Sequence, residues 1–293
     1  MDLLEAIILG IVQGATEFLP VSSSGHLVLV SWWLNIGTPP LVYSVMVHLG
    51  TTAAVLVYFW PEWRQLAYAG YVAVRRREID VESNPYLRLL ILLIVGTIPA
   101  GIAGLVLADF FEETFSKPAI VSISLLITAG LLTYSEWVSG RTTPGSLNAP
   151  TDLDAQSETD LITRRLGFGD SLFIGVAQAL AIMPGISRSG STIAGGLFRG
   201  LSRPIATRYS FLLATPIILA AGLKQTLDVL TGAADVDDDM GLVLLAGFFS
   251  AAVVGYLSIA IMLQFVRRQK LYGFAVYCAV FGLLSLGAVL IQG

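Results

Sequence analysis

Cysteine, histidine and lysine are scarce in this chain. Its 293 residues include one cysteine, two histidines and three lysines. The single cysteine, Cys278, excludes an internal disulfide and argues against a cysteine-based metal site. The P-loop pattern GxxxxGK[ST], the zinc-protease pattern HExxH and any His/Cys cluster are also absent from the sequence. These absences exclude P-loop nucleotide hydrolases, zinc proteases and disulfide-stabilised domains.

Charge is scarce as well. Charged residues make up 13% of the chain and apolar residues 55%, whereas a soluble chain carries about 25% charged residues. The basic run Arg75–Arg77 is typical of a topology signal beside a membrane, so no nucleic-acid partner is expected. Met1–Glu5 contains no basic residue, so no cleavable signal peptide is expected. The composition predicts an integral membrane protein whose partners include membrane lipids.

Long apolar segments predict the architecture. A helix needs about 20 apolar residues to cross the hydrocarbon core of a bilayer. Two other apolar regions, 1–35 and 170–200, are each broken near the middle by a polar stretch with Pro and Gly. We therefore expect an all-α polytopic membrane protein with six transmembrane helices and two re-entrant helical hairpins. The six expected spans are residues 41–60, 87–108, 117–138, 208–230, 241–264 and 271–291.

Loop charges predict the orientation. Arginines gather in residues 61–86, 139–169 and 265–270, which the positive-inside rule places in the cytoplasm. Hairpin 1–35 then starts and ends outside, and hairpin 170–200 starts and ends inside. Each half of the chain becomes one hairpin plus three spans in opposite orientation, which is an inverted-topology repeat.

The whole chain, 1–293, is expected to form a single membrane domain. The first repeat covers 1–138 and the second covers 170–293. Residues 139–169 between them are polar and rich in Pro, Gly, Ser and Thr, which predicts a flexible cytoplasmic linker.

Short segments of the two halves are similar in sequence, which agrees with the repeat. Gly10-Ile-Val-Gln13 resembles Gly175-Val-Ala-Gln178, and Pro20-Val-Ser-Ser-Ser-Gly25 resembles Pro184-Gly-Ile-Ser-Arg-Ser-Gly190. Folds with inverted repeats place the functional site near the midplane, where the halves meet.

The first polar stretch runs from Gln13 to His26. Gln13 and Glu17 are spaced i, i+4, so on a helix they share a face and can bind a hard cation or orient a nucleophile. The segment Ser22-Ser23-Ser24-Gly25 precedes an apolar helix, so its free N–H groups offer an anion site. His26 can serve as general acid or base.

These residues also have structural interpretations. Glu17 can bind backbone groups freed at Pro20, a serine can cap the following helix, and His26 can be a neutral core histidine. Ionisable groups at membrane depth cost roughly 2.5–3.5 kcal/mol each, and three serines exceed the need of one cap, so we favour a functional site. His48 is expected to be a packing residue or one that supports a site residue, and Glu136 is expected to lie at the membrane interface.

The second polar stretch, Pro184 to Thr192, centres on Arg188. A guanidinium inside an apolar hairpin needs an anion, and arginine binds phosphate through two parallel hydrogen bonds. The alternative is an internal salt bridge to Glu17, which would also bring the two motifs together. The pattern predicts a phosphate site with Ser187, Ser189, Gly190 and Thr192 beside the arginine.

Together these motifs resemble the undecaprenyl pyrophosphate phosphatase family, the membrane enzymes linked to bacitracin resistance. That family carries an [E/Q]xxxE motif and a Pro-Val-Ser-Ser-x-Gly-His segment, which correspond to Gln13–Glu17 and Pro20–His26. Its second motif, PGxSRSxxT, corresponds to Pro184–Thr192. The resemblance covers essentially the whole chain. Gln13 leaves one carboxylate in the first motif, which weakens the case for a two-carboxylate metal site.

The resemblance implies hydrolysis of a polyprenyl pyrophosphate to the monophosphate and inorganic phosphate, which recycles a lipid carrier for cell-envelope glycans. It implies a multi-pass protein of the plasma membrane. Because the first motif lies on the hairpin that enters from outside, we expect the site to open to the extracellular or periplasmic side. The resemblance also implies a divalent cation, Mg²⁺ or Ca²⁺, held by Glu17 with Gln13. A homo-oligomer is compatible with this interpretation.

Catalytic roles fall on four residues when the resemblance and the chemistry are combined. Arg188 clamps the pyrophosphate, and Ser23 is the nucleophile, with a metal-activated water as the alternative. His26 activates the serine or protonates the leaving group, and Glu17 holds the metal or orients that pair. The substrate-binding set is Gln13, Ser22, Ser24, Gly25, Ser187, Ser189, Gly190 and Thr192, of which Ser22 and Ser187 are alternative nucleophiles.

The competing class is a transporter or flippase of a phosphorylated lipid or anion. Inverted repeats with broken helices at the midplane are typical of transporters. A transporter needs anion-binding groups but no serine, histidine and carboxylate together, so the first motif favours an enzyme. A purely structural membrane subunit would leave both motifs unexplained.

Overall fold

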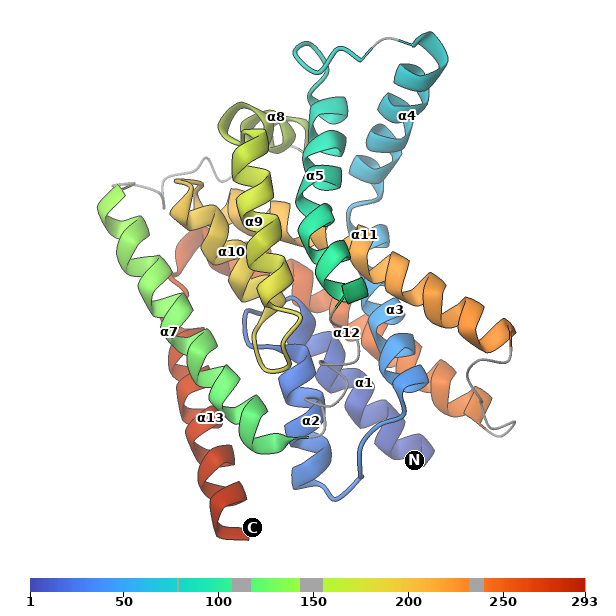
Figure 1. Cartoon of the computed structure of the whole chain (residues 1–293), viewed down its shortest axis with the longest axis vertical. Coiled ribbons are helices and arrows are strands. Elements are labelled where there is room, and N and C mark those ends of the chain that lie inside the picture. Colours follow the sequence, from blue (N-terminus) through green and yellow to red (C-terminus); the bar gives the residue numbers. More distant parts are fainter. Residues whose placement is uncertain (78, 107–116, 143–154, 232–239, 293) are drawn as a thin grey trace.

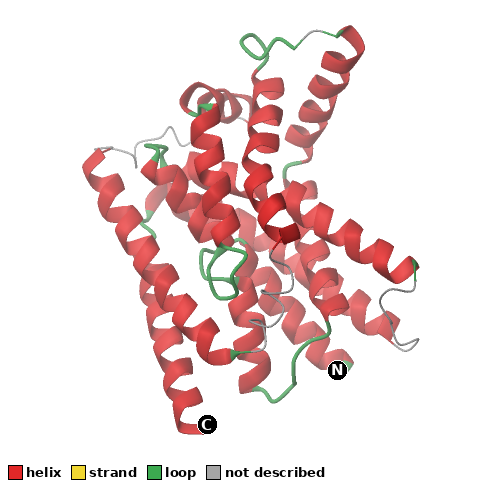
Figure 2. Cartoon of the chain, viewed as in Figure 1, coloured by secondary structure: helices red, strands yellow, loops and turns green. Residues whose placement is uncertain are grey.

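Helices account for the secondary structure of the chain. The computed structural model describes residues 1–292 except 78, 107–116, 143–154 and 232–239, and no strand occurs in this described part (Figure 2). The helices are α1 (Leu3–Glu17), α2 (Ser23–Trp33), α3 (Leu41–Tyr58), α4 (Trp60–Arg76), α5 (Pro85–Val106), α7 (Pro118–Thr142), α8 (Ala155–Arg165), α9 (Phe168–Leu180), α10 (Arg188–Phe198), α11 (Arg203–Leu230), α12 (Gly241–Arg268) and α13 (Tyr272–Gln292).

Six of the helices are long and apolar enough to cross a membrane, as predicted. The largest difference at a helix start is in α11, which begins at Arg203 rather than at residue 208. The guanidiniums of Arg203 and Arg208 are paired with buried carboxylates, so these charges do not end the apolar helix. The candidate spans are Leu41–Tyr58, Pro85–Val106, Pro118–Arg141, Arg203–Lys224, Gly241–Arg268 and Tyr272–Ile291.

Both chain ends lie at one end of the molecule. Figure 1 shows the N- and C-termini at the lower end and the α4–α5 connection, with α8, at the upper end. The predicted topology also puts the two termini on one side and residues 61–86 on the other. Which end faces the cytoplasm stays a prediction.

Two pairs of short helices carry the polar stretches. The α1–α2 pair turns between Glu17 and Ser23, and the α9–α10 pair turns between Leu180 and Arg188. These are the segments predicted as hairpins, with the motifs at their tips. Their re-entrant placement in a bilayer stays a prediction.

The short helices pack across the two halves of the chain. Helix α1 runs along α12, and α9 runs along α5. A Cβ on Gly14 would lie 2.7 Å from the carbonyl oxygen of Ala251, and one on Gly175 would lie 2.3 Å from that of Gly96. Glycines therefore let the helix backbones touch at both crossings. This matched packing agrees with an inverted repeat, which itself stays a prediction.

Two regions predicted as loop contain packed helices. In α4, Leu66, Ala69 and Ala73 are buried. In α8, which lies within the predicted linker 139–169, Ile162 is buried in the main hydrophobic core. The prediction of a flexible linker is therefore wrong over α8, because an apolar side chain inside this polar segment anchors it.

Buried ion pairs join helices that lie far apart in the sequence. Arg203 binds both carboxylate oxygens of Glu136, through Nε at 2.7 Å and Nη2 at 2.5 Å, and the backbone N–H of Leu271 donates to the same carboxylate at 3.0 Å. Glu136 is 1% exposed, and its interfacial depth in the membrane stays a prediction. Arg208 pairs with Glu62 and also with Glu158.

Candidate active site

The tips of the two short-helix pairs lie against each other. A Cβ on Gly25 would lie 3.1 Å from the Cα of Gly185. The hydroxyl of Ser189 donates to the carbonyl of Leu19 at 3.0 Å. Gly185 has a φ of +88°, which glycine adopts without steric cost. Two motifs that lie far apart in the sequence therefore form one site.

A serine caps the second helix of each pair. Ser22 Oγ accepts from the backbone N–H of Gly25 at 3.3 Å, and Ser187 Oγ accepts from that of Gly190 at 3.0 Å. The capping interpretation is thus confirmed for Ser22, and Ser187 is a second cap that was not predicted. Helices α2 and α10 both begin at the tips, so the positive ends of their dipoles lie where an anion would bind.

Glu17 is the centre of the polar cluster. One carboxylate oxygen accepts from Nη2 of Arg188. The other accepts from the hydroxyl of Ser23 and, at 2.8 Å, from Nε2 of Gln13. The partners of Glu17 are side chains, so its carboxylate does not bind the backbone N–H groups near Pro20. The predicted salt bridge to Arg188 is present and joins the two motifs.

A cavity of about 190 Å³ opens beside this cluster. Glu17, Ser23 and Arg188 line it, as the sequence predicts. Most of the other lining residues are serines, alanines and isoleucines, so the guanidinium of Arg188 and the carboxylate of Glu17 lie among hydroxyls and apolar side chains. The polar members of the lining are Glu17, Ser22, Ser23, Ser24, His48, Gln178, Ser187, Arg188 and Ser189.

His26 lies apart from that lining. Its Nδ1 is 2.7 Å from the carbonyl oxygen of Ser22, and its Nε2 is 2.7 Å from the hydroxyl of Tyr277. The ring stacks on Phe281 at 4.9 Å. Both ring nitrogens are occupied, so the expected grouping of His26 with Ser23 around one cavity is not seen. His26 ties the first tip to α13 instead.

His48 occupies the place expected for His26. It lines the cavity, and its Nε2 lies 3.8 Å from the carboxylate of Glu17. Its Nδ1–H donates to the carbonyl of Ser44 at 2.7 Å, which leaves Nε2 facing the carboxylate. His48 was expected either to pack or to support a site residue, and its contact with Glu17 fits the second alternative. Its position as an ionisable residue within an apolar span was the signal that could have found it.

Some predicted binding residues support the tips from behind. Gln13, Gly25, Gly190 and Thr192 are not in the cavity lining. The hydroxyl of Thr192 donates to the carbonyl of Arg188 at 2.9 Å and lies 2.5 Å from that of Ser210. Thr192 therefore supports the backbone of the second motif, whereas Gln13 bonds the side chain of Glu17.

Two further residues escaped prediction. Gln178, near the end of α9, lines the cavity. Thr128 of α7 holds the second tip, because its hydroxyl accepts from the N–H of Ser187 and donates to the carbonyl of Gly185, both at 3.1 Å. A lone threonine in an apolar span has no local pattern that would mark it.

A larger apolar chamber adjoins the polar cavity. Its volume is about 650 Å³, and the two share Ser24, His48, Ile182, Ile217 and Ile218 in their linings. A polar site that borders an apolar chamber suits a ligand with a charged head and a hydrocarbon tail. The rest of the chamber lining is mostly apolar: Leu27, Val28, Thr38, Pro39, Leu41, Ser44, Val45, Gly104, Ala221 and Gly222.

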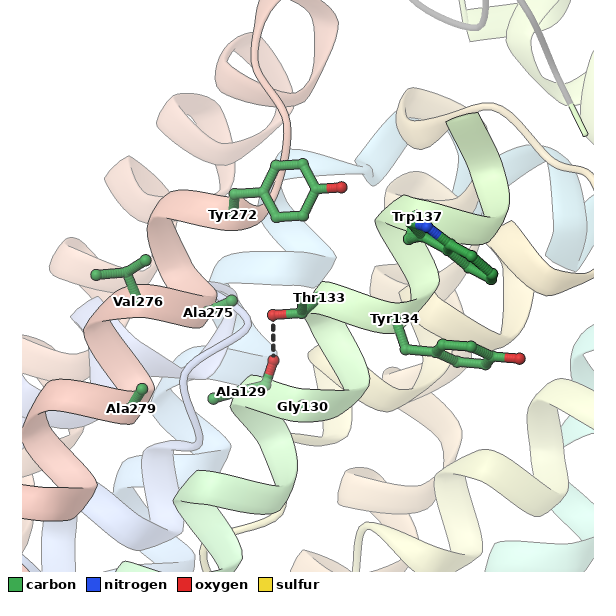
Figure 3. A pocket seen from close by; sticks show the side chains of 9 residues that line it. All are labelled: Ala129, Gly130, Thr133, Tyr134, Trp137, Tyr272, Ala275, Val276 and Ala279. Atoms are coloured by element: carbon green, nitrogen blue, oxygen red, sulfur yellow. Dashed lines mark hydrogen bonds between the residues drawn. The ribbon is translucent and has the colours of Figure 1, made fainter. Parts of the chain in front are cut away.

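Another hollow, of about 560 Å³, lies between α7 and α13 (Figure 3). Small and aromatic side chains line it, and none of its lining residues is charged. The hydroxyl of Thr133 is bonded to the carbonyl of Ala129 in its own helix at 2.8 Å. This hollow has no group suited to a phosphate.

The metal expected from the resemblance must be tested against the donors present. Among the described residues, no group of three His, Cys, Asp or Glu side chains could hold a metal ion. Gln13 Oε1, beside Glu17, is buried without a partner in the same part of the chain. A hard cation fits here when phosphate oxygens of a ligand complete its coordination, as is common for Mg²⁺.

Comparisons with known proteins identify the family of this chain. The family model described as bacitracin resistance protein BacA matches residues 6–284. A protein of Methanosphaera stadtmanae named undecaprenyl-diphosphatase is 40% identical, with 98% of both chains covered. Proteins of the same name are 40% identical in Desulforudis audaxviator, over 100% of both chains, and 42% identical in Syntrophotalea carbinolica, over 96% of this chain and 97% of that one. The chain therefore belongs to the BacA family of bacitracin resistance proteins.

Proposed function

We propose that this multi-pass membrane protein hydrolyses undecaprenyl-type polyprenyl pyrophosphate to polyprenyl phosphate and inorganic phosphate, and so recycles a lipid carrier. The observation that carries the proposal is the Ser23–Glu17–Arg188 cluster at the meeting tips, beside an apolar chamber. This combination offers a nucleophile, a base and a phosphate clamp to a lipid. The names of the similar proteins point to the same reaction.

Arg188 is the proposed phosphate clamp. Its Nη2 is held by Glu17, and its Nη1 is buried without a partner among the described residues. A buried guanidinium edge without an acceptor is costly, and a phosphoryl group supplies that acceptor. The same edge stabilises the charge that develops on the phosphoryl oxygens during transfer.

Ser23 is the proposed nucleophile and Glu17 its base. The Ser23 hydroxyl already donates to Glu17, so the carboxylate is placed to take that proton. Oγ then bonds to the terminal phosphorus, and the bond from that phosphorus to the bridging oxygen breaks. The polyprenyl phosphate leaves with the electron pair, and water afterwards releases the phosphate from the serine. Direct attack by water held at Glu17 is the alternative.

The two histidines have different proposed roles. His48 Nε2 faces Glu17 and can share the proton that the carboxylate receives. His26 acts through the first tip, whose Ser22 carbonyl it contacts. Glu17 and Gln13, the latter through Oε1, would hold the divalent cation, Mg²⁺ or Ca²⁺. When bound, it would neutralise charge on the pyrophosphate.

The apolar chamber is the proposed site of the prenyl tail. Its lining includes Thr38 and Pro39 of the α2–α3 connection. Loop charges predict that this connection lies outside the cell. The head site would then open toward the extracellular or periplasmic face, and the tail would leave between helices toward the lipid.

Phosphate release by the purified protein in detergent tests the proposal. A lipid flippase has no bilayer to act across under these conditions, so release of phosphate from a prenyl pyrophosphate supports hydrolysis over translocation. Absence of release from folded protein supplied with Mg²⁺ or Ca²⁺ would contradict the proposal and favour the transporter.

A further inference from the structure

Gln178 is a buried amide whose bonding is incomplete. It lies near the end of α9 and is 2% exposed. Both its Nε2 and its Oε1 have no hydrogen-bond partner within the described residues. Buried side-chain amides are nearly always bonded, because an unpaired buried donor or acceptor destabilises the fold. The amide of Gln178 therefore has hydrogen-bonding capacity that a ligand could use.

The position of Gln178 indicates what that ligand is. The residue lines the polar cavity together with Glu17 and Arg188. Arg188 Nη1 also lacks a partner in the described part of the chain. Unsatisfied donors from two helices, α9 and α10, thus border one cavity. Ala100, Ala181 and Ile182 are neighbours in the lining and cannot bond the amide through their side chains.

We propose that Gln178 binds the pyrophosphate head of the substrate, with its Nε2–H donating to a phosphoryl oxygen; this rests on the proposed function. Arg188 can hold one phosphoryl group with its planar fork. The other phosphoryl group needs donors of its own. A neutral amide supplies one in an apolar wall without the cost of burying a second permanent charge.

A ligand-binding role predicts opposite effects on binding and on stability. Removing an unpaired buried amide lowers the cost of folding, so the free protein should not lose stability. Removing a donor to a charged phosphoryl oxygen should weaken substrate binding. A purely structural glutamine would give the reverse, with a lower Tm and an unchanged KM.

The experiment compares Gln178→Met with wild-type protein in detergent. Methionine is unbranched and has a similar length, but it cannot donate a hydrogen bond. KM and kcat are measured with a short-chain prenyl pyrophosphate, and Tm is measured without substrate. We expect KM to rise roughly tenfold or more, the effect of one lost hydrogen bond to a charged group, with Tm equal to or above that of wild type.

The matched control is Ser139→Ala. The Ser139 hydroxyl is also buried without a partner among the described residues, but it does not line the cavity. This control should keep both KM and kcat. Gln178→Glu is the second variant: it keeps the shape of the side chain and replaces the donor with a group that repels phosphate. Its KM should rise at least as much.

The outcomes separate this proposal from the proposed function. KM does not depend on the amount of folded enzyme, so it is informative even if a variant is less stable. An unchanged KM in either Gln178 variant would overturn the assignment. Failure of both variants to fold would mark a structural residue and would overturn it too. Inactive wild-type protein would instead contradict the proposed hydrolysis.

Discussion

Glu17 and Arg188 form an ion pair although 171 residues separate them in the sequence. The carboxylate comes from the end of α1 and the guanidinium from the start of α10, so the pair exists only when the two tips meet. At membrane depth neither charge is tolerated without the other. The pair is thus both the link between the motifs and the centre of the proposed chemistry.

Arg188→Ala should lower turnover by about 10²-fold or more, the scale of one lost transition-state donor. Arg188→Lys should not restore activity, because lysine lacks the planar fork. The measurement is phosphate release from a prenyl pyrophosphate in detergent. The matched control is Arg199→Lys, since Arg199 is 48% exposed and pairs with Asp170. Near-normal turnover of the alanine variant would refute the clamp.

Ser23→Ala should nearly abolish turnover, because it removes the hydroxyl that donates to Glu17. Ser22→Ala removes a helix cap, so it should mainly lower Tm, by an amount that corresponds to roughly 1 kcal/mol. Steady-state kinetics and thermal unfolding separate the two effects. If Ser23→Ala remains active, water at Glu17 becomes the nucleophile.

His48→Asn should reduce kcat with little change in Tm, since its Nε2 faces the cavity. His26→Ala should lower Tm, because the ring is stacked on Phe281 and bonded to Tyr277 and Ser22. Tyr277→Phe is the control that removes one of those bonds and keeps the ring. A His26 variant with normal Tm and no turnover would return the catalytic role to His26.

Glu136→Leu should destabilise the protein by about 3–5 kcal/mol, because Arg203 would remain buried without its carboxylate. Replacing both partners, with Arg203→Met as the second change, should recover part of that loss. Thermal unfolding of the single and double variants gives the comparison. Activity per folded molecule should be unchanged, and a specific loss of kcat would assign the pair to the site.

Cysteine labelling should report the orientation. A cysteine at Thr38 should react with an impermeant maleimide in intact cells, and one at Ser83 only after lysis. Both residues are exposed at the connections α2–α3 and α4–α5, and the native Cys278 is buried. The opposite pattern would reverse the predicted topology and remove the reason for outward access.

Local sequence patterns predicted the spans and the tips well, because span length and motif spacing act over short distances. Long-range contacts caused the misses. His26 turns toward Tyr277, which lies 251 residues away, and no local pattern reveals that partner. His48 and Gln178 are single polar residues in apolar helices. The ionisable ring of His48 and the match of Gln178 to Gln13 were weak local signals, and only the fold shows that both side chains line one cavity. The buried ion pair of Glu136 was not predicted, because its partner, Arg203, comes from another helix.

The packing of α1 along α12 has a consequence for biogenesis. Helix α1 is synthesised well before α12 (Gly241–Arg268), the helix that covers Gly14. During synthesis the α1–α2 pair therefore exists for a time without α12 and without Arg188, the charged partner of Glu17. The native surroundings of α1 are complete only after most of the chain has been made.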